Sequence, residues 1–334
     1  MTSATLTNNA AARTAPTSLA SYWVTLLIVV LSLSGLAIFA ESDKLTPGIP
    51  FQQLLSYKFT SYANLLLVAG SLLYFAHLRF KAESVGKWAT ALATAGMMGG
   101  LMALLVRWFE SHQVLEEGHI PITNLYEVTL FFSALTTLIY LILESIYRRK
   151  AMGAFVMPIV IAAIGFELWL VSQGQVGPQN LVPALKSYWL HAHVLANFIG
   201  YGAFAVAAGA GAMYLMRARA ERKGRSSSLP NLDTTDAIAY KAIAIGFPTF
   251  TIATILGAAW AYDAWGGYWS WDPKETWSLI VWLTYAAWLH LRFVKGWSGT
   301  RMAWWSILGF VVTLFCFLGV NMFLSGLHSY GSLS

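Results

Sequence analysis

Nine apolar segments of about 20 residues recur along the chain, separated by shorter polar connections. Each is long enough to cross the ~30 Å hydrocarbon core of a bilayer as a helix, and the two-residue alternation of barrel strands is absent. The pattern predicts an all-α, polytopic integral membrane helical bundle with about nine transmembrane helices. The expected spans are 19–40, 61–80, 87–107, 122–146, 152–172, 188–216, 240–262, 274–292 and 302–325.

Two polar stretches stand apart from these spans. Residues 1–18 are rich in Ala and Thr and lack the basic region and apolar core of a signal peptide, so we expect a flexible tail that precedes a membrane domain over 19–334. Residues 217–239 carry many charges and a Ser-Ser-Ser-Leu-Pro run, which is typical of a solvated cytoplasmic linker. Charged residues make up only 11% of the chain, against roughly 25% in soluble globular proteins, which excludes that class.

The distribution of basic residues predicts the orientation. With the N-terminus inside and the C-terminus outside, 16 of the 21 Lys and Arg residues fall on the inner side, as the positive-inside rule requires. These residues then face an anionic inner leaflet. The net charge of +6 therefore needs no nucleic-acid partner.

The outer loop 263–275 has the most unusual composition in the chain. It places Trp265, Tyr268, Trp269 and Trp271 within seven residues, beside glycines that allow close approach to the backbone. The following Asp272-Pro273-x-Glu275 predicts a helix start with a capping box. An aromatic belt at the membrane interface is the alternative interpretation, but anchoring needs fewer aromatic residues. We predict a platform for a flat, apolar, metal-bearing macrocycle, namely haem.

Two histidines are expected at the level of this loop. His193 lies near the outer start of the sixth span, and His328 follows the outer end of the ninth. A neutral imidazole binds iron through one ring nitrogen, so His193 and His328 are candidate ligands on the two faces of one haem. His191 is about 200° around the helix from His193 and cannot face the same ligand. The single cysteine, Cys316, lies within a span, and no Cys-x-x-Cys-His motif is present, so covalently attached haem on this chain is not expected.

A second candidate site lies toward the inner side. His290 is 17 residues beyond Pro273, about 26 Å along a helix, and its neighbour Arg292 is a candidate partner for a propionate. His77 has the same His-Leu-Arg-Phe setting at the inner end of the second span. Both histidines are candidate ligands; alternatively, both cap helices at the interface.

Several further polar residues lie in or near the outer loops and within the spans. His119, like His112, is expected in the outer loop 108–121. A solvated loop residue is the favoured interpretation, and His119 is a weaker candidate for haem binding than His193 and His328. Arg107 and Glu127 are expected to form a structural ion pair on the outer side, whereas Glu167, within the fifth span, has no explanation from sequence.

Three blocks of the sequence resemble the CcsA (ResC) family, the membrane subunit of the system II cytochrome c synthase. Residues 118–127 (GHIPITNLYE) are similar to its GHxPxxNLYE segment, and residues 189–194 (WLHAHV) to its W-L-x-x-H-V segment. The aromatic loop, continuing to His290, is similar to its WWD domain. The resemblance covers nearly the whole chain from about residue 60.

This resemblance implies roles for particular residues. His193 and His328 match the two external haem ligands of the family, and His290 matches a transmembrane ligand. The loop residues Trp265, Trp269, Trp271 and Asp272 match the segment that holds haem. The other transmembrane ligand is expected from a CcsB (ResB) partner, and since no CcsB-like soluble domain is present in this sequence, we expect that partner to be a separate protein.

The resemblance also implies the activity and its location. Haem b is the expected substrate and bound ligand, and an apocytochrome c with a Cys-x-x-Cys-His motif is the acceptor, kept reduced indirectly by thiol-reducing factors. The expected reaction is thioether formation by a cytochrome c haem lyase, on the periplasmic face of a bacterial inner membrane or the lumenal face of a thylakoid. Two alternatives remain: a CcmC-type haem transporter or presenter without covalent chemistry, and a b-type electron-transfer subunit.

Overall fold

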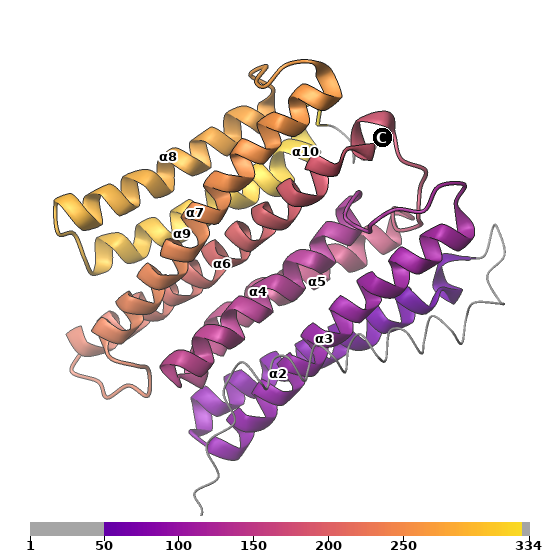
Figure 1. Cartoon of the computed structure of the whole chain (residues 1–334). Helices are drawn as coiled ribbons and strands as arrows, with labels where there is room; N and C mark the ends of the chain where they lie inside the picture. Colours follow the sequence, from indigo (N-terminus) through magenta and orange to yellow (C-terminus); the bar gives the residue numbers. More distant parts are fainter. Residues whose placement is uncertain (1–49, 329–334) are drawn as a thin grey trace, which may run out of the picture.

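The described part of the chain is a bundle of long helices that run roughly along one common direction (Figure 1). The structure is a computed structural model that describes residues 50–328; the expected tail 1–18 and first span 19–40 lie outside this range. No strand occurs within the described range. Its long helices are α2 (Leu55–Phe80), α3 (Glu83–Val114), α4 (Leu125–Tyr147), α5 (Gly153–Ser172), α6 (Tyr188–Arg222), α7 (Leu232–Trp265), α8 (Pro273–Val294) and α9 (Thr300–Leu314).

Shorter elements connect or extend these helices. Single 3-10 turns are η1 (Phe51–Gln53), η2 (Lys150–Met152) and η3 (Pro183–Lys186). After α9 the chain continues through a π-helical turn, η4 (Phe315–Gly319), into α10 (Val320–Phe323). Together α9, η4 and α10 form the last expected span.

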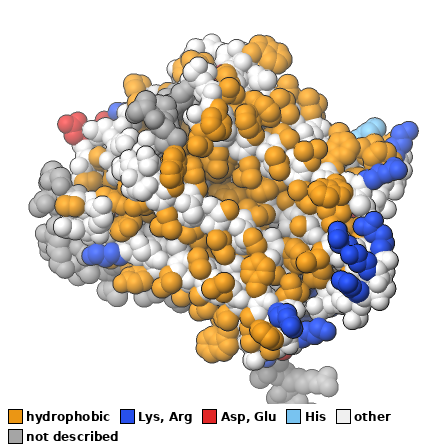
Figure 2. Space-filling view, turned by 180° about the vertical axis from the view of Figure 1, so that it is seen from behind, with side chains coloured by type: hydrophobic (Ala, Val, Ile, Leu, Met, Phe, Trp, Pro, Cys, Tyr) orange, Lys and Arg blue, Asp and Glu red, His pale blue; other side chains and the backbone are white. Residues whose placement is uncertain are grey.

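The prediction of an all-α polytopic membrane bundle is confirmed. Within residues 50–328, seven helices are long and apolar enough to cross a membrane, and α8 is not among them. Figure 2 shows a broad hydrophobic surface over most of one face, with Lys and Arg gathered at the edge where Figure 1 places the α6–α7 and α8–α9 connections. The total of nine spans and the inside–outside orientation stay predictions.

Several helix limits differ from the expected ones. Helix α3 continues to Val114, so His112 lies in a helix rather than in a loop. Helices α6 and α7 extend into the expected linker 217–239 from both sides, which leaves only 223–231 outside the two helices. Charged and polar residues at the ends of long helices are compatible with helical structure beyond the apolar part, which is the part that hydropathy detects.

Helix α6 forms the centre of the bundle. Every residue from Gly200 to Gly211 is buried, and the helix contacts α4, α5, α7 and α9. This stretch consists mainly of Ala and Gly, and small residues allow helix backbones to approach closely where lipid provides no hydrophobic driving force between helices. The close packing around α6 fixes the ends of its neighbours, and the site lies at one of these ends.

Candidate functional site

The loop between α7 and α8 has the helix start that the sequence predicts. Asp272 is the N-cap of α8: its carboxylate accepts a hydrogen bond from the backbone N–H of Lys274, and the full capping box with Glu275 is present. The Oε2 of Glu275 accepts from the backbone N–H groups of Ser270 (2.7 Å) and Asp272 (3.2 Å). These bonds hold the loop in one shape. The predicted capping box is therefore confirmed.

Trp271 combines an unusual backbone conformation with an exposed side chain. It adopts a left-handed conformation with φ of 61°, which is uncommon for a bulky residue and is strained. Its side chain is 68% exposed and packs at right angles against Trp269, with ring centroids 5.7 Å apart. Tyr268 stacks on Tyr262 at 4.5 Å. The capping bonds hold a strained, aromatic surface at the end of the bundle.

His193 and His328, which were expected at one level of the membrane, both line one cavity. The cavity contains about 1130 Å³ of space not filled by atoms, part of which is open to solvent, and Tyr268 and Trp269 of the loop line it as well. The indole of Trp260 contacts both imidazoles, with ring centroids 5.9 Å from His193 and 5.3 Å from His328. The two imidazole centroids are therefore at most about 11 Å apart.

Each of these imidazoles is held through the same ring nitrogen. The Nδ1 of His193 lies 2.7 Å from the carbonyl oxygen of Ala253, and the Nδ1 of His328 lies 2.8 Å from a carboxylate oxygen of Asp272. An oxygen acceptor at Nδ1 fixes the tautomer that leaves Nε2 with a free lone pair, and metal-binding histidines typically have such an acceptor. Both residues therefore have the arrangement of a histidine prepared to bind a metal.

Two glycines permit this arrangement. A Cβ at Gly257 of α7 would lie 2.7 Å from Cε1 of His193, and a Cβ at Gly326 would lie 2.3 Å from Oδ1 of Asp272. Such distances are shorter than carbon contacts allow. The absence of a side chain at Gly326 leaves room for the Asp272 carboxylate. Its Oδ1 accepts from the backbone N–H of Leu327 at 2.6 Å, and its Oδ2 contacts His328.

Burial affects the charge of His328. Removal from water lowers the pKa of its imidazole below the usual value, while the hydrogen bond to Asp272 acts in the opposite direction and is the smaller effect. The neutral form, which is the form that binds a metal, is favoured.

Two other predicted residues of the loop lie beside the cavity without lining it. Trp265 packs edge-on against His328 with ring centroids 4.8 Å apart, and Asp272 contacts Nδ1 of His328. Trp260 was not identified from the sequence, although it follows Ala253 and Gly257 on one face of α7 at helical spacing. That spacing was the available signal. Its Nε1 donates to the carbonyl oxygen of Ala184 at 2.8 Å, which fixes the indole in contact with both histidines.

The predicted inner residues do not form one site. Helices α2 and α8 lie on opposite sides of the bundle (Figure 1), so His77 and His290 are separated. His77 directs Nδ1 to the carbonyl oxygen of Ala82 at 2.9 Å, which supports the alternative of a helix-end contact. His290 is exposed on α8. Arg292 forms an ion pair with Asp236 through both terminal nitrogens and is thereby already neutralised.

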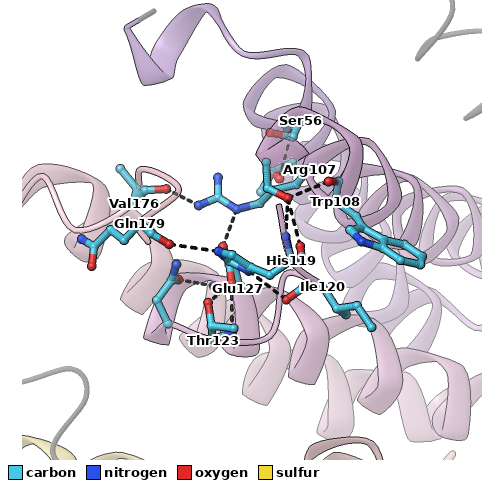
Figure 3. Close-up of polar contacts among 12 residues, drawn as sticks. Ser56, Arg107, Trp108, His119, Ile120, Thr123, Glu127, Val176 and Gln179 are labelled. Carbon is cyan, nitrogen blue, oxygen red and sulfur yellow. Dashed lines mark hydrogen bonds and ion pairs between the residues drawn. The ribbon is translucent and has the colours of Figure 1, made fainter. Parts of the chain in front are cut away.

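His119 belongs to a separate buried network (Figure 3). Its ring nitrogens lie 3.2 Å from the carbonyl oxygen of Ile120 and 3.0 Å from that of Gln179, so both are engaged by the backbone. Beside it Arg107 and Glu127 form the expected ion pair, at 2.7 Å, with both side chains buried. This network joins the 115–124 and 173–187 connections, and it gives His119 a structural environment.

Glu167, unexplained by sequence, has polar partners inside the bundle. Its carboxylate accepts from the amide of Asn64 at 2.8 Å and from the hydroxyl of Ser133 at 3.4 Å.

Comparisons with known proteins agree with this picture. The family described as cytochrome C assembly protein matches residues 122–328. Proteins named cytochrome c biogenesis protein CcsA are 38% identical over 235 residues in Chlamydomonas reinhardtii, 40% over 249 in Guillardia theta and 36% over 294 in Synechococcus elongatus. These alignments cover 69%, 68% and 73% of this chain, and 65%, 80% and 89% of the respective relatives.

A solved structure also shares the fold. The cytochrome c heme lyase CcmF superposes with a TM-score of 0.61 at 20% sequence identity, over 82% of this chain and 48% of that one. At that identity the likeness concerns the fold, and this chain spans about half the length of that protein.

Fold and site together define a polytopic, all-α membrane protein with an aromatic cavity between two prepared histidines at one end of its bundle. The sequence match is specific beyond that class. The chain belongs to the CcsA family of cytochrome c assembly proteins.

Proposed function

We propose that this protein binds haem b in the cavity between His193 and His328 and attaches it to an apocytochrome c on the outer side of the membrane. Membership of the CcsA family places the chain in cytochrome c biogenesis and haem handling. A CcsB (ResB) membrane protein is the proposed partner, and the periplasmic or lumenal face is the proposed side. The name of the structural neighbour, cytochrome c heme lyase, is in line with a covalent product.

One observation carries this proposal. Two imidazoles from distant parts of the chain line one cavity, and each has its Nδ1 occupied by an oxygen acceptor. Six-coordinate haem needs two such ligands, one for each face of the ring. Tyr268 and Trp269 line the same cavity and offer apolar surface to a flat macrocycle, so the residues present suit haem as a substrate.

The chain's own residues supply binding and orientation. Ala253 and Asp272 hold the proton on Nδ1 of the two histidines and keep Nε2 directed away from these acceptors. The opening of the cavity to solvent gives the acceptor polypeptide access. Haem supplies the two vinyl groups to which the thiols of the acceptor's Cys-x-x-Cys-His motif add, while the protein contributes mainly proximity.

We also propose His290 as a transmembrane ligand that acts with a histidine of the CcsB partner. Its exposed position on α8 makes it accessible to another protein chain. In this scheme haem binds at His290 first and then moves to the outer site.

The test is co-expression with a CcsB partner and a c-type cytochrome in cells that lack other maturation systems. His193→Ala and His328→Ala are expected to weaken bound haem at the outer site and to lower covalent product, and added imidazole is expected to restore part of both. His112→Ala is a matched control, because His112 lies at the same end of the bundle on α3 and does not line the cavity.

Two results would contradict parts of the proposal. Bound haem without any covalent product in the wild-type complex would favour a CcmC-type presenter. Unchanged haem in both histidine variants would remove the ligand assignment.

A further inference from the structure

Lys274 contributes a cation to the wall of the cavity. It is the second residue of α8 and lines the cavity together with His193 and His328. Among the described residues that line this cavity, it is the only Lys or Arg. Its Nζ donates to the carbonyl oxygen of Phe317 at 3.1 Å and to Oδ1 of Asn321 at 3.0 Å. These neutral acceptors place the ammonium group without an ion pair.

The nearby carboxylates are engaged elsewhere. No ion pair joins Lys274 to a carboxylate within 4.0 Å in residues 50–328. Asp272 accepts from His328 and from the backbone of Leu327, and Glu275 accepts from the backbone of the aromatic loop. An ammonium has three N–H donors, and two of those of Lys274 have acceptors.

The ammonium group of Lys274 is held by other parts of the fold and is not a flexible group at the surface. Phe317 belongs to the π-helical turn η4, within the last long helical segment. Single π-helical turns inside α-helices occur frequently at functional sites. This turn presents a backbone carbonyl to Lys274, and Asn321 of α10 provides the second acceptor. The ammonium is thereby held at the cavity with one donor remaining for a ligand.

We propose that Lys274 is a carboxylate-binding subsite of the cavity, which takes one propionate of the bound tetrapyrrole. This inference rests on the proposed haem function and adds a polar anchor to the two iron ligands. A charged acceptor supplies the missing counter-charge and forms a charge-assisted hydrogen bond, which is stronger than a neutral one. An anchor at the edge of the ring also sets its rotation about the axis through the two imidazoles. Lys274 is thus a positioning residue for the vinyl groups.

The experiment compares haem with its dimethyl ester, which has the same ring and iron but no carboxylates. Both are titrated into the purified full-length chain and followed by absorbance, which reports affinity and axial ligation without any covalent product. The wild type is expected to bind haem about tenfold or more tightly than the ester. Lys274→Met should abolish that preference by weakening haem binding alone, and Lys274→Arg should keep most of it.

Two variants guard against a purely structural effect. Lys274→Gln keeps an N–H donor for Phe317 and Asn321 but removes the charge, so it is expected to lose the preference while the fold remains. Lys186→Met is the matched control, because Lys186 pairs with the exposed Glu117 and does not line the cavity. Its preference for haem over the ester should equal that of the wild type.

The outcomes separate the two proposals. If the wild type binds both ligands with bis-histidine spectra but does not discriminate between them, the carboxylate subsite is wrong and the haem site stands. Equal weakening of both ligands in the Met and Gln variants also overturns the subsite. If neither ligand shows bis-histidine ligation in the wild type, the haem site itself fails.

Discussion

Replacement of Asp272 tests whether the cavity is organised as the structure indicates. This buried carboxylate caps α8, accepts from the backbone N–H of Leu327 and holds Nδ1 of His328. Alanine removes both carboxylate oxygens and with them all three contacts. Asparagine keeps one acceptor oxygen, which serves one of the two backbone donors, and loses the charge that favours the Nδ1–H tautomer of His328. The two variants therefore separate stability from ligand orientation.

The magnitudes follow from these contacts. Loss of an N-cap costs about 1 kcal/mol, and loss of the bond from Leu327 to a charged acceptor costs about 1.5–3 kcal/mol. We expect Asp272→Ala to destabilise the protein by about 3 kcal/mol and Asp272→Asn by roughly half of that. Removal of the acceptor behind a ligating histidine typically costs about 10–100-fold in affinity. Haem binding at the outer site should fall by that factor in both variants.

The assay combines thermal unfolding in a fixed detergent with haem titration of the same preparations. Asp263→Asn is the matched control, since Asp263 is an exposed carboxylate near the C-terminal end of α7, at the same end of the bundle as Asp272. The control should match the wild type in both measurements. Haem affinity within twofold of the wild type in both Asp272 variants would refute the role assigned to the contact between Asp272 and His328.

Three further predictions concern other parts of the structure. Gly257→Ala places a Cβ 2.7 Å from the ring of His193, so haem titration should show weaker binding, and thermal unfolding should show a loss of about 1–3 kcal/mol. Arg107→Met leaves the buried Glu127 without its partner and should destabilise the fold by about 3–5 kcal/mol, whereas the double replacement Arg107→Met with Glu127→Leu should recover much of the loss in the same unfolding assay. Because burial lowers the pKa of His328, the unfolded state binds more protons between that lowered value and about 6.5; stability should therefore rise with pH across this window and be lost as pH falls through it, and a His328→Gln variant should show a weaker dependence than the wild type.

The membrane helices and the start of α8 could be predicted from short stretches of the sequence. Spans of 20 or so apolar residues predict membrane helices because the bilayer demands internal satisfaction of every backbone polar group. The start of α8 at Asp272 and Pro273 also followed from local rules, since capping involves residues only three positions apart. Helix ends were less predictable: α7 begins at Leu232, where a charged linker was expected.

Only part of the candidate site could be predicted from the sequence. His193 and His328 were paired from their expected level in the membrane, and both line one cavity in the structure; their role as haem ligands stays a prediction. Trp260 and Lys274 were missed because a single Trp is common near a membrane interface and Lys274 lies in the first turn of α8, next to the expected outer loop, where a charged residue is ordinary. Their roles arise from neighbours far away in sequence, such as His328 for Trp260 and Phe317 for Lys274.

The amino-acid sequence by itself determined the class of protein, the helices and the aromatic loop, because each depends on hydropathy and on contacts between near neighbours. Only the tertiary structure decided which polar groups meet. It directed Asp272 to His328, the carbonyl of Ala253 to His193, and Asp236 to Arg292. The physical reason is that these contacts depend on how α6, α7, α8 and the C-terminal segment pack against one another, and that packing is a property of the whole bundle.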